Sequence, residues 1–126
     1  MNVLADTSVW IDYFKDGSAA HLDFLIEEGL VAVNELILAE LIPYLELKRQ
    51  YEVIALLREV TCFEMVLDWD GIVEMQVTCL RHGINKVGIP DLMIAQNAIE
   101  RGVELYTMDK HFRLMGRHLP LKLYDL

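Results

Sequence analysis

One stretch of the chain predicts a helix followed by a strand: Gly88–Phe112, with the sequence GIPDLMIAQNAIERGVELYTMDKHF. Pro90 supplies a backbone φ suited to a helix start, and Asp91 in the first turn faces the positive end of the helix dipole. The apolar run Val103–Thr107 then predicts a short strand, and Asp109 comes just after it. Because ligand-binding groups gather at the carboxyl ends of parallel strands, Asp91 and Asp109 are expected to face one crevice. Taken singly, each is equally explained as an ordinary helix-start or turn residue, so the functional interpretation depends on further carboxylates reaching the same place.

Predicted strands alternate with predicted helices along the whole chain. The strands are expected at Met1–Ala5, Leu30–Val33, Cys62–Val66, Val103–Thr107 and Leu121–Tyr124. The helices are expected at Val9–Phe14, Leu22–Ile26, Glu35–Lys48, Tyr51–Val60, Asp68–Arg81, Pro90–Gly102 and His111–Gly116, with a break between the first two at Asp16–Ser18. This alternation predicts an α/β fold with helices on both faces of a parallel sheet. With 126 residues and no repeat or linker, we expect a single domain over residues 1–126.

The composition favours a folded cytosolic protein. Hydrophobic residues make up 54% of the chain, yet no run approaches the ~18 apolar residues of a membrane span. The N-terminus lacks the basic and apolar regions of a secretory signal. The two cysteines, Cys62 and Cys79, fall within apolar patterns and are expected to be reduced core residues of a cytoplasmic protein.

The charge balance is acidic, with 20 Asp and Glu against 11 Lys and Arg and a formal net charge of −9. This argues against a protein that coats nucleic acid by general electrostatic attraction. It leaves room for a site where metal ions cancel several clustered carboxylates.

Two further carboxylates join Asp91 and Asp109. Asp6 follows the first predicted strand, and Glu40 lies in a predicted helix among apolar residues, where a charge is costly unless it is paired or metal-bound. The alternative for Glu40 is a side chain that reaches the surface. Pro43, three residues later, predicts a kink or a boundary in that helix. Four carboxylates together would repel one another, and a hard divalent cation such as Mg²⁺ or Mn²⁺ relieves that repulsion, which points to metal-assisted phosphodiester hydrolysis.

With these residues in order, the chain resembles the PIN-domain ribonucleases, in particular the VapC-type toxins of toxin–antitoxin pairs. The resemblance covers nearly the whole chain. It is carried by the strings LADTSVWIDYF, NELILAEL and IPDLMIAQNAIERGVELYTMDKHF. It implies a three-layer α/β/α fold around a central parallel sheet of four to five strands.

The resemblance also implies an activity and a site. Asp6 and Asp91 would be the principal ligands of one or two Mg²⁺ or Mn²⁺ ions, and Glu40 and Asp109 would complete the site. Ser8 and Thr107 match supporting hydroxyl positions. The implied activity is endonucleolytic cleavage of RNA through an activated water, and the implied partners are a cognate antitoxin and a second copy of the chain.

The sequence departs from the family pattern in two respects. Met108 stands where the family often carries Arg or Asn, so one polar contact is in doubt. The acidic balance is unfavourable for an RNA-binding surface. A local basic rim is one interpretation of the Lys and Arg residues, and ordinary solvated side chains are the other. The residues concerned are Lys15, Lys48, Arg49, Arg81, Lys86, Lys110 and Arg113.

Two other functions compete with the nuclease. One is a PIN-like scaffold that has lost turnover and works mainly as a protein-binding module. The other is a phosphoryl-transfer protein of a different α/β type, such as a receiver domain or a haloacid-type phosphatase. The sequence DTSVW after the first strand lacks the second carboxylate that the phosphatase motif needs, and the layout of a receiver domain is also missing. Fold-level analogy is a weak guide between such classes.

Overall fold

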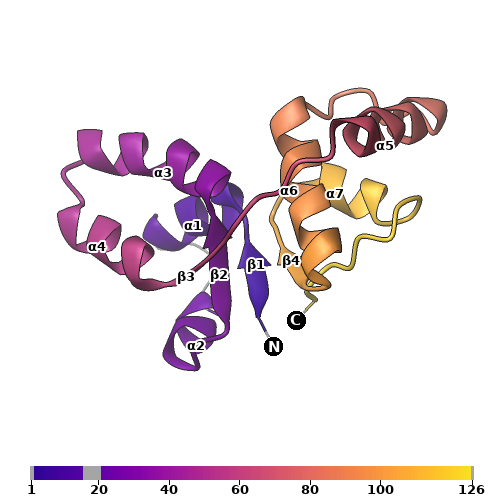
Figure 1. Cartoon of the computed structure of the whole chain (residues 1–126). Helices are drawn as coiled ribbons and strands as arrows, with labels where there is room; N and C mark the ends of the chain where they lie inside the picture. Colours follow the sequence, from indigo (N-terminus) through magenta and orange to yellow (C-terminus); the bar gives the residue numbers. More distant parts are fainter. Residues whose placement is uncertain (1, 16–20, 126) are drawn as a thin grey trace.

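A computed structural model describes residues 2–15 and 21–125 of the chain (Figure 1). Met1 of the first expected strand and the expected break at Asp16–Ser18 lie outside these residues. The strands are β1 (Val3–Ala5), β2 (Val31–Asn34), β3 (Thr61–Phe63) and β4 (Glu104–Tyr106). The helices are α1 (Thr7–Phe14), α2 (His21–Glu27), α3 (Glu35–Leu47), α4 (Tyr51–Glu59), α5 (Trp69–Arg81), α6 (Ile89–Arg101) and α7 (Lys110–Met115).

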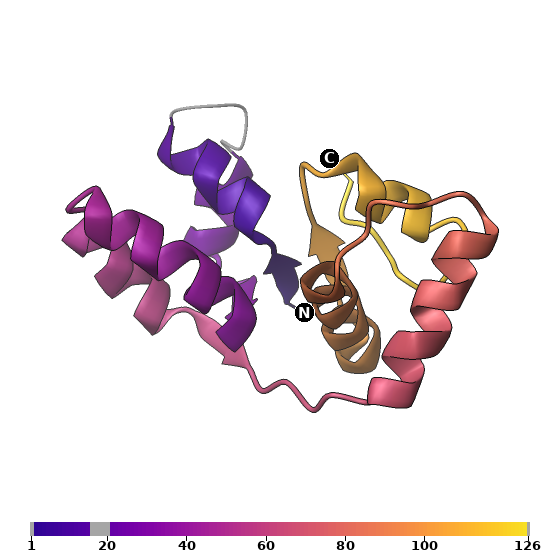
Figure 2. The ribbon, with the colours of Figure 1, turned by 90° about the horizontal axis from the view of Figure 1, so that it is seen from above.

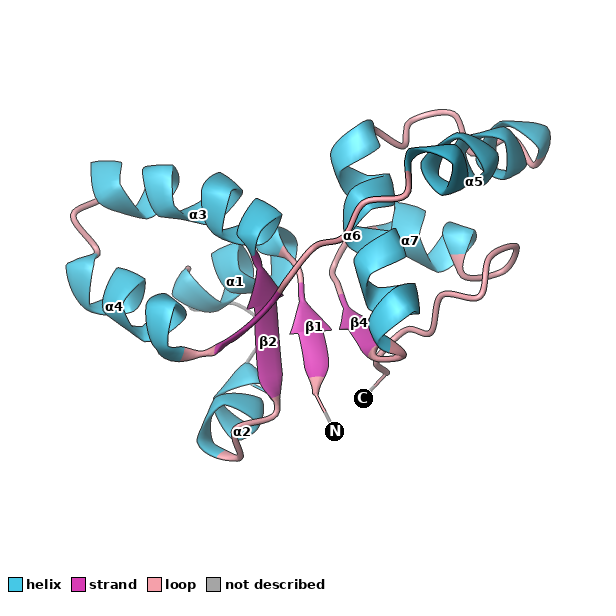
Figure 3. Ribbon diagram, in the orientation of Figure 1, coloured by secondary structure: helices cyan, strands magenta, loops and turns pink. Residues whose placement is uncertain are grey.

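The four strands form one parallel sheet in the order β3-β2-β1-β4. Val3 of β1 pairs with Val31 on one side and with Glu104 on the other. Helices flank the sheet, as Figure 3 shows, which confirms the predicted α/β fold. The expected fifth strand, Leu121–Tyr124, is reduced to a single parallel bridge between Leu105 and Leu123 beside β4.

The core is the sheet and the helix faces that cover it. Leu4, Ala32 and Leu105 in three neighbouring strands are completely buried. Trp10 of α1 is equally buried, and its indole Nε1 donates a hydrogen bond to the Ala5 carbonyl at 3.1 Å. A buried indole N–H usually needs such a partner. The buried core therefore holds in place the strand ends that precede α1, α3 and α7.

Two local expectations were wrong. Of the two alternatives at Pro43, a boundary is contradicted, since α3 runs through the proline with the buried side chains of Leu41 and Leu45 holding the helix on both sides of it. Cys62 is exposed rather than part of the core, since it lies on the edge strand β3; Cys79 is buried as expected, and both cysteines are free.

The apolar residues of α5 mostly face outward. Ile72 is buried, but four apolar neighbours are exposed because α5 packs mainly on α6 and lies outside it, away from the sheet (Figure 2). These exposed residues are Trp69, Val73, Val77 and Leu80. In the described ranges, 2–15 and 21–125, no helix has the length and apolar character needed to span a membrane.

Candidate active site

Asp6 stands at the junction between β1 and α1, where its backbone is extended and its side chain caps the helix. Its Oδ1 accepts hydrogen bonds from the Val9 amide at 3.3 Å and from the Ser8 hydroxyl at 2.6 Å. Its Oδ2 accepts a hydrogen bond from the Thr107 hydroxyl at 2.7 Å. The carboxyl group is therefore fixed on both oxygens although only 4% of the residue is exposed.

The two hydroxyl side chains also join β1 to the loop that follows β4. The Met108 amide donates to the Ser8 hydroxyl at 3.0 Å, and the Asp109 amide donates to the Thr107 hydroxyl at 3.0 Å. Met108 itself contributes only its backbone here, and its side chain is exposed. Ser8 and Thr107 thus hold Asp6 and the turn carrying Asp109 in one rigid unit.

Asp109 caps α7 and forms a close pair with a histidine. Its Oδ1 accepts from the His111 amide at 2.9 Å and lies 2.8 Å from Nδ1 of the same residue. The pair is partly exposed, with 28% of the His111 side chain and 34% of the Asp109 side chain accessible. His111 was not among the residues that the sequence singled out, because the relevant signal is only a histidine two residues after a helix-capping Asp.

Asp91 lies in the first turn of α6, where its Oδ2 accepts from the Gly88 amide at 3.2 Å. Burial raises the pKa of Asp91, and the nearby charge of Asp109 raises it further, while the Gly88 amide and His111 act in the opposite direction. Asp91 and Asp109 therefore share one electrostatic environment although they belong to different elements.

The same repulsion reaches Asp6. Burial raises the pKa of the Asp6 carboxyl; the donors Ser8, Thr107 and Val9 lower this pKa, and the charge of Asp109 adds to the increase. Asp109 is thus the charge that links Asp6 and Asp91. In the described part of the chain, neither Lys nor Arg forms a salt bridge with any of the three carboxylates.

Glu40 is placed differently from the expectation of a charge in apolar surroundings. Its residue is exposed, because the position lies on the outer side of α3. Its Oε1 accepts a hydrogen bond from the Thr7 hydroxyl at 2.7 Å. Glu40 is therefore connected to the first turn of α1, one residue after Asp6, and no burial cost is needed to explain it.

The donor set suits a hard cation, although it is not arranged as a finished metal site. Among the described residues, no three His, Cys, Asp or Glu side chains are positioned to hold a metal ion together. Within the same part of the chain, no group donates a hydrogen bond to Oδ2 of Asp109 or to Oδ1 of Asp91. Carboxylate oxygens without hydrogen-bond donors, on mutually repelling groups, are the chemistry that Mg²⁺ or Mn²⁺ accepts.

Buried amide side chains position α6 and α3 around this site, and two of them, Gln96 and Asn97, were not singled out by the sequence. Asn34 at the end of β2 caps α3, and its Nδ2 donates to Oδ1 of Asn97 at 3.0 Å. Asn97 in turn donates to the Glu64 carbonyl at 3.2 Å. Gln96 accepts from the Asp68 amide and donates to its carbonyl, at 3.1 and 2.9 Å. A helical pattern marked α6 by its apolar residues, so its buried polar residues gave no signal.

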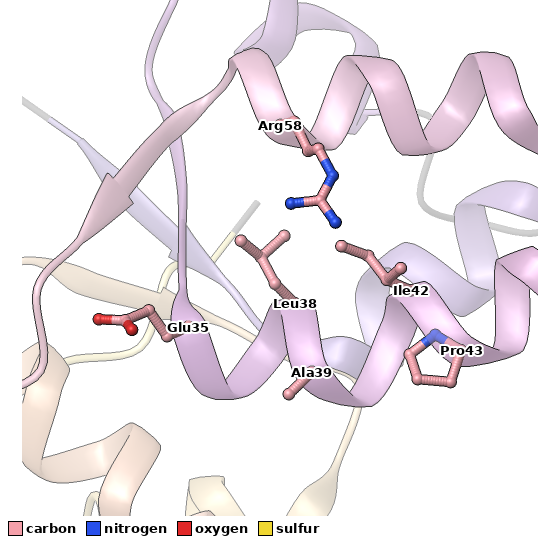
Figure 4. A pocket seen from close by; sticks show the side chains of 6 residues that line it. All are labelled: Glu35, Leu38, Ala39, Ile42, Pro43 and Arg58. Atoms are coloured by element: carbon pink, nitrogen blue, oxygen red, sulfur yellow. The ribbon is translucent and has the colours of Figure 1, made fainter.

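A separate hollow of about 430 Å³ lies between α3 and α4, away from these carboxylates. Figure 4 shows Leu38 and Ile42 of α3 pointing toward the guanidinium of Arg58 from α4. The lining is completed by Glu35, Ala39 and Pro43. The lining is mostly apolar and includes one cation. The hollow is therefore better suited to binding another protein than to hydrolysing a phosphodiester.

The fold and site together define an α/β protein with a 3-2-1-4 parallel sheet and carboxylates gathered after β1, at the start of α6 and after β4. The PIN domain family model matches residues 3–117 of the chain. The chain therefore belongs to the PIN-domain family. No curated protein matches it.

Solved structures share the fold at low sequence identity. A chain of VapBC2 from Rickettsia felis, bound to a promoter DNA fragment, matches with a TM-score of 0.77 and 19% identity over 100% of this chain and 99% of that one. A chain of DNA-bound VapBC from Salmonella typhimurium matches with a TM-score of 0.77 and 20% identity, covering 99% and 98%. VapC20 from Mycobacterium tuberculosis, a toxin that cleaves the sarcin–ricin loop, matches with a TM-score of 0.66 and 19% identity, covering 96% and 99%.

Proposed function

We propose that this protein is a cytoplasmic, metal-dependent endoribonuclease that acts as the toxin of a toxin–antitoxin pair, with residues 1–126 forming one PIN-like domain. The observation that carries the proposal is that the charge of Asp109 acts on both Asp6 and Asp91, while none of the three forms a salt bridge with Lys or Arg in the described chain. Membership of the PIN family and the fold shared with an RNA-cleaving toxin support it.

In this proposal Asp6, Asp91 and Asp109 hold one or two Mg²⁺ or Mn²⁺ ions, with Glu40 completing the site. When bound, such an ion lowers the pKa of a water molecule and stabilises charge on the phosphate that is attacked. Ser8 and Thr107 keep the Asp6 carboxylate oriented through their hydroxyl groups. Asp109 and His111 form a polar rim where RNA can approach, since both side chains are partly exposed.

We assign the hollow between α3 and α4 to the antitoxin. Its apolar lining beside the exposed Arg58 fits a partner segment that carries a carboxylate next to apolar side chains. The fold shared with chains of VapBC assemblies supports a protein partner.

We assign the exposed face of α5 to a second copy of the chain. Its exposed side chains recur at helical spacing on one face, namely Trp69, Val73, Val77 and Leu80, with 58%, 60%, 40% and 54% of each residue accessible. Two α5 helices packed antiparallel about a two-fold axis would bring Asp70 near the start of each helix close to Arg81 at the end of the other. The charges are therefore complementary in a symmetric pair.

The test is cleavage of a mixed pool of structured RNAs by the purified protein with Mg²⁺, with Mn²⁺ and with EDTA. Asp91→Asn protein, purified in parallel, controls for contaminating nucleases. We expect metal-dependent cleavage that the variant loses, and growth arrest in a bacterial host that expresses the wild type but not the variant. If wild type and variant are equally inactive toward RNA and harmless to the host, and neither binds Mn²⁺, the chain is a protein-binding module instead.

A further inference from the structure

The positive charge of this acidic protein is concentrated in its C-terminal segment. From Lys110 to Tyr124 the sequence contains no Asp or Glu, four Lys or Arg residues and two histidines. The whole chain has a formal charge of −9, so the part outside this segment carries −13. The four cations of this segment, called here the basic strip, are Lys110, Arg113, Arg117 and Lys122, and all are exposed.

The basic strip begins at the candidate active site. Lys110 directly follows Asp109, whose side chain caps α7, and α7 leads the chain away from the carboxylates. Figure 2 shows α7 and the chain after it on the side of α6 that faces away from α3 and α4. A strand of RNA whose cleaved bond lies beside Asp109 therefore meets the basic strip as its neighbouring nucleotides leave the site.

The shape of the basic strip favours an extended polyanion over a single phosphate. A hollow of about 320 Å³ is lined by two of these cations, Arg113 and Arg117, together with Leu121, Leu123 and Asp125. The four cations are spread over α7 and the chain after it, from Lys110 to Lys122, which matches the separate phosphates of a backbone. Arg113 pairs with Asp125 at 2.8 Å, and both of these side chains are more than half exposed. An exposed pair of this kind is weak, so a phosphate competes for Arg113 readily.

The basic strip offsets the electrostatic repulsion between the acidic site and RNA. Asp6, Asp91 and Asp109 repel the phosphate backbone, and the protein as a whole repels RNA. Cations next to the site offset that repulsion locally, which raises the concentration of substrate where it is cut.

Resting on the proposed ribonuclease function, we propose that the basic strip binds the phosphate backbone of single-stranded RNA flanking the cleaved bond. Of the residues considered for a basic rim from the sequence, the basic strip keeps Lys110 and Arg113. It adds Arg117 and Lys122. Lys48 and Arg49, at the turn between α3 and α4, have no part in it because they lie at the far end of the molecule (Figure 1).

The experiment measures binding of a fluorescein-labelled, mixed-sequence single-stranded RNA by anisotropy, between about 50 and 200 mM NaCl, to Asp91→Asn protein that does not cut it. The test variant adds Lys110→Gln and Arg117→Gln. The matched control adds Lys48→Gln and Arg49→Gly, which removes the same charge and places glycine where φ is 55°. Thermal melts establish that each protein is folded.

Each phosphate contact to single-stranded nucleic acid contributes about 0.7 to the slope of log affinity against log salt, so the test variant should lose about 1.4. Over this salt range, its affinity should then fall about seven-fold less than that of the parent. The control should keep the parent's slope. Asp125→Asn, which releases Arg113, should bind RNA more tightly than the parent.

Three results would overturn the inference: a test variant with the parent's slope, a control that changes as much as the test variant, or tighter binding of polyglutamate of matched charge than of RNA. Tighter binding of polyglutamate would indicate that the basic strip binds an acidic protein segment and not RNA. RNA cleavage by the wild type, measured alongside, separates this inference from the proposed function. If the wild type cleaves RNA but the test variant keeps the parent's salt slope, only the proposed contact between RNA and the basic strip is refuted. If the wild type neither cleaves RNA nor binds Mn²⁺, the nuclease function itself is refuted.

Discussion

Replacing Thr107 by Val removes the one hydroxyl that contacts both Asp6 and Asp109. The hydroxyl donates to Oδ2 of Asp6 at 2.7 Å and accepts from the Asp109 amide at 3.0 Å, while only 4% of Thr107 is exposed. Valine keeps the shape and loses both hydrogen bonds. A hydrogen bond to a charged group contributes about 1.5–3 kcal/mol, and leaving a buried amide without a partner costs about 1–3 kcal/mol. We therefore expect the free energy of unfolding to fall by about 2–4 kcal/mol at neutral pH.

The size of this loss should depend on pH. The Thr107 hydroxyl lowers the pKa of Asp6, so it stabilises the ionised carboxylate. Its removal raises the pKa of Asp6 further, and the folded state of the variant then holds its proton more tightly than that of the wild type. The destabilisation should thus be smaller at about pH 4 than at neutral pH, because protonation of Asp6 weakens the hydrogen bond that the variant lacks, whereas the unpartnered Asp109 amide costs the same at both pH values.

Urea denaturation followed by circular dichroism, in EDTA and at both pH values, measures this difference. Thr107→Ser is the matched control, because it keeps the hydroxyl and loses only a methyl group, at a cost of about 1 kcal/mol. A valine variant as stable as the serine variant, or an equal loss at both pH values, would refute the idea that this hydroxyl holds the charged centre.

Three further predictions follow from the same structure. Because burial raises the pKa of Asp6, the folded state binds a proton at this carboxyl more tightly than the unfolded state does. The stability of the metal-free protein should therefore fall as pH rises from the ordinary carboxyl range to the raised pKa. Asp6→Asn should flatten this dependence in thermal melts across pH. Val73→Lys on α5 should convert a dimer to a monomer in light scattering, whereas Val66→Lys, the same change at an exposed site outside α5, should not. Asn97→Ala should lower the free energy of unfolding by about 2–3 kcal/mol in urea titrations, because it breaks the hydrogen bonds to Asn34 and to the Glu64 carbonyl. A loss below about 0.5 kcal/mol would contradict the structural role of Asn97.

Local rules were sufficient to predict most of the fold. Pro90 and Gly102 marked the start and the end of α6, and Gly102 does adopt the left-handed conformation, with φ of 65°. Asn34 and Asp68 are residue types favoured at helix starts, and both accept the corresponding backbone hydrogen bonds. These signals are short-range, so one sequence carries them completely.

Burial depends on which elements meet, and sequence periodicity does not contain that. The apolar residues of α5 recur along one side of the helix, yet Val73 is 60% exposed because α5 lies outside α6. Glu40 suggested a buried charge, yet its position is exposed and bonds to Thr7. The sequence had left a surface side chain open as the alternative for Glu40, and the structure agrees with that alternative.

The site shows the same division. Asp6 and Asp109 were recognisable because each follows a strand, and parallel strands bring their ends together. The link between them through Ser8, Thr107 and the Met108 amide spans about a hundred residues, and no spacing rule predicts it. His111 escaped notice for a related reason, since its importance comes only from its contact with Asp109.

In the proposed function, Asp6, Asp91 and Asp109 form one cation site. Binding of Mn²⁺, followed by loss of the free-ion signal in electron paramagnetic resonance, tests this claim without requiring the RNA target. We predict binding to the wild type and loss of binding in both Asp6→Asn and Asp91→Asn, while Lys48→Gln binds normally. Equal binding by all four proteins, or no binding by the wild type, would contradict the claim.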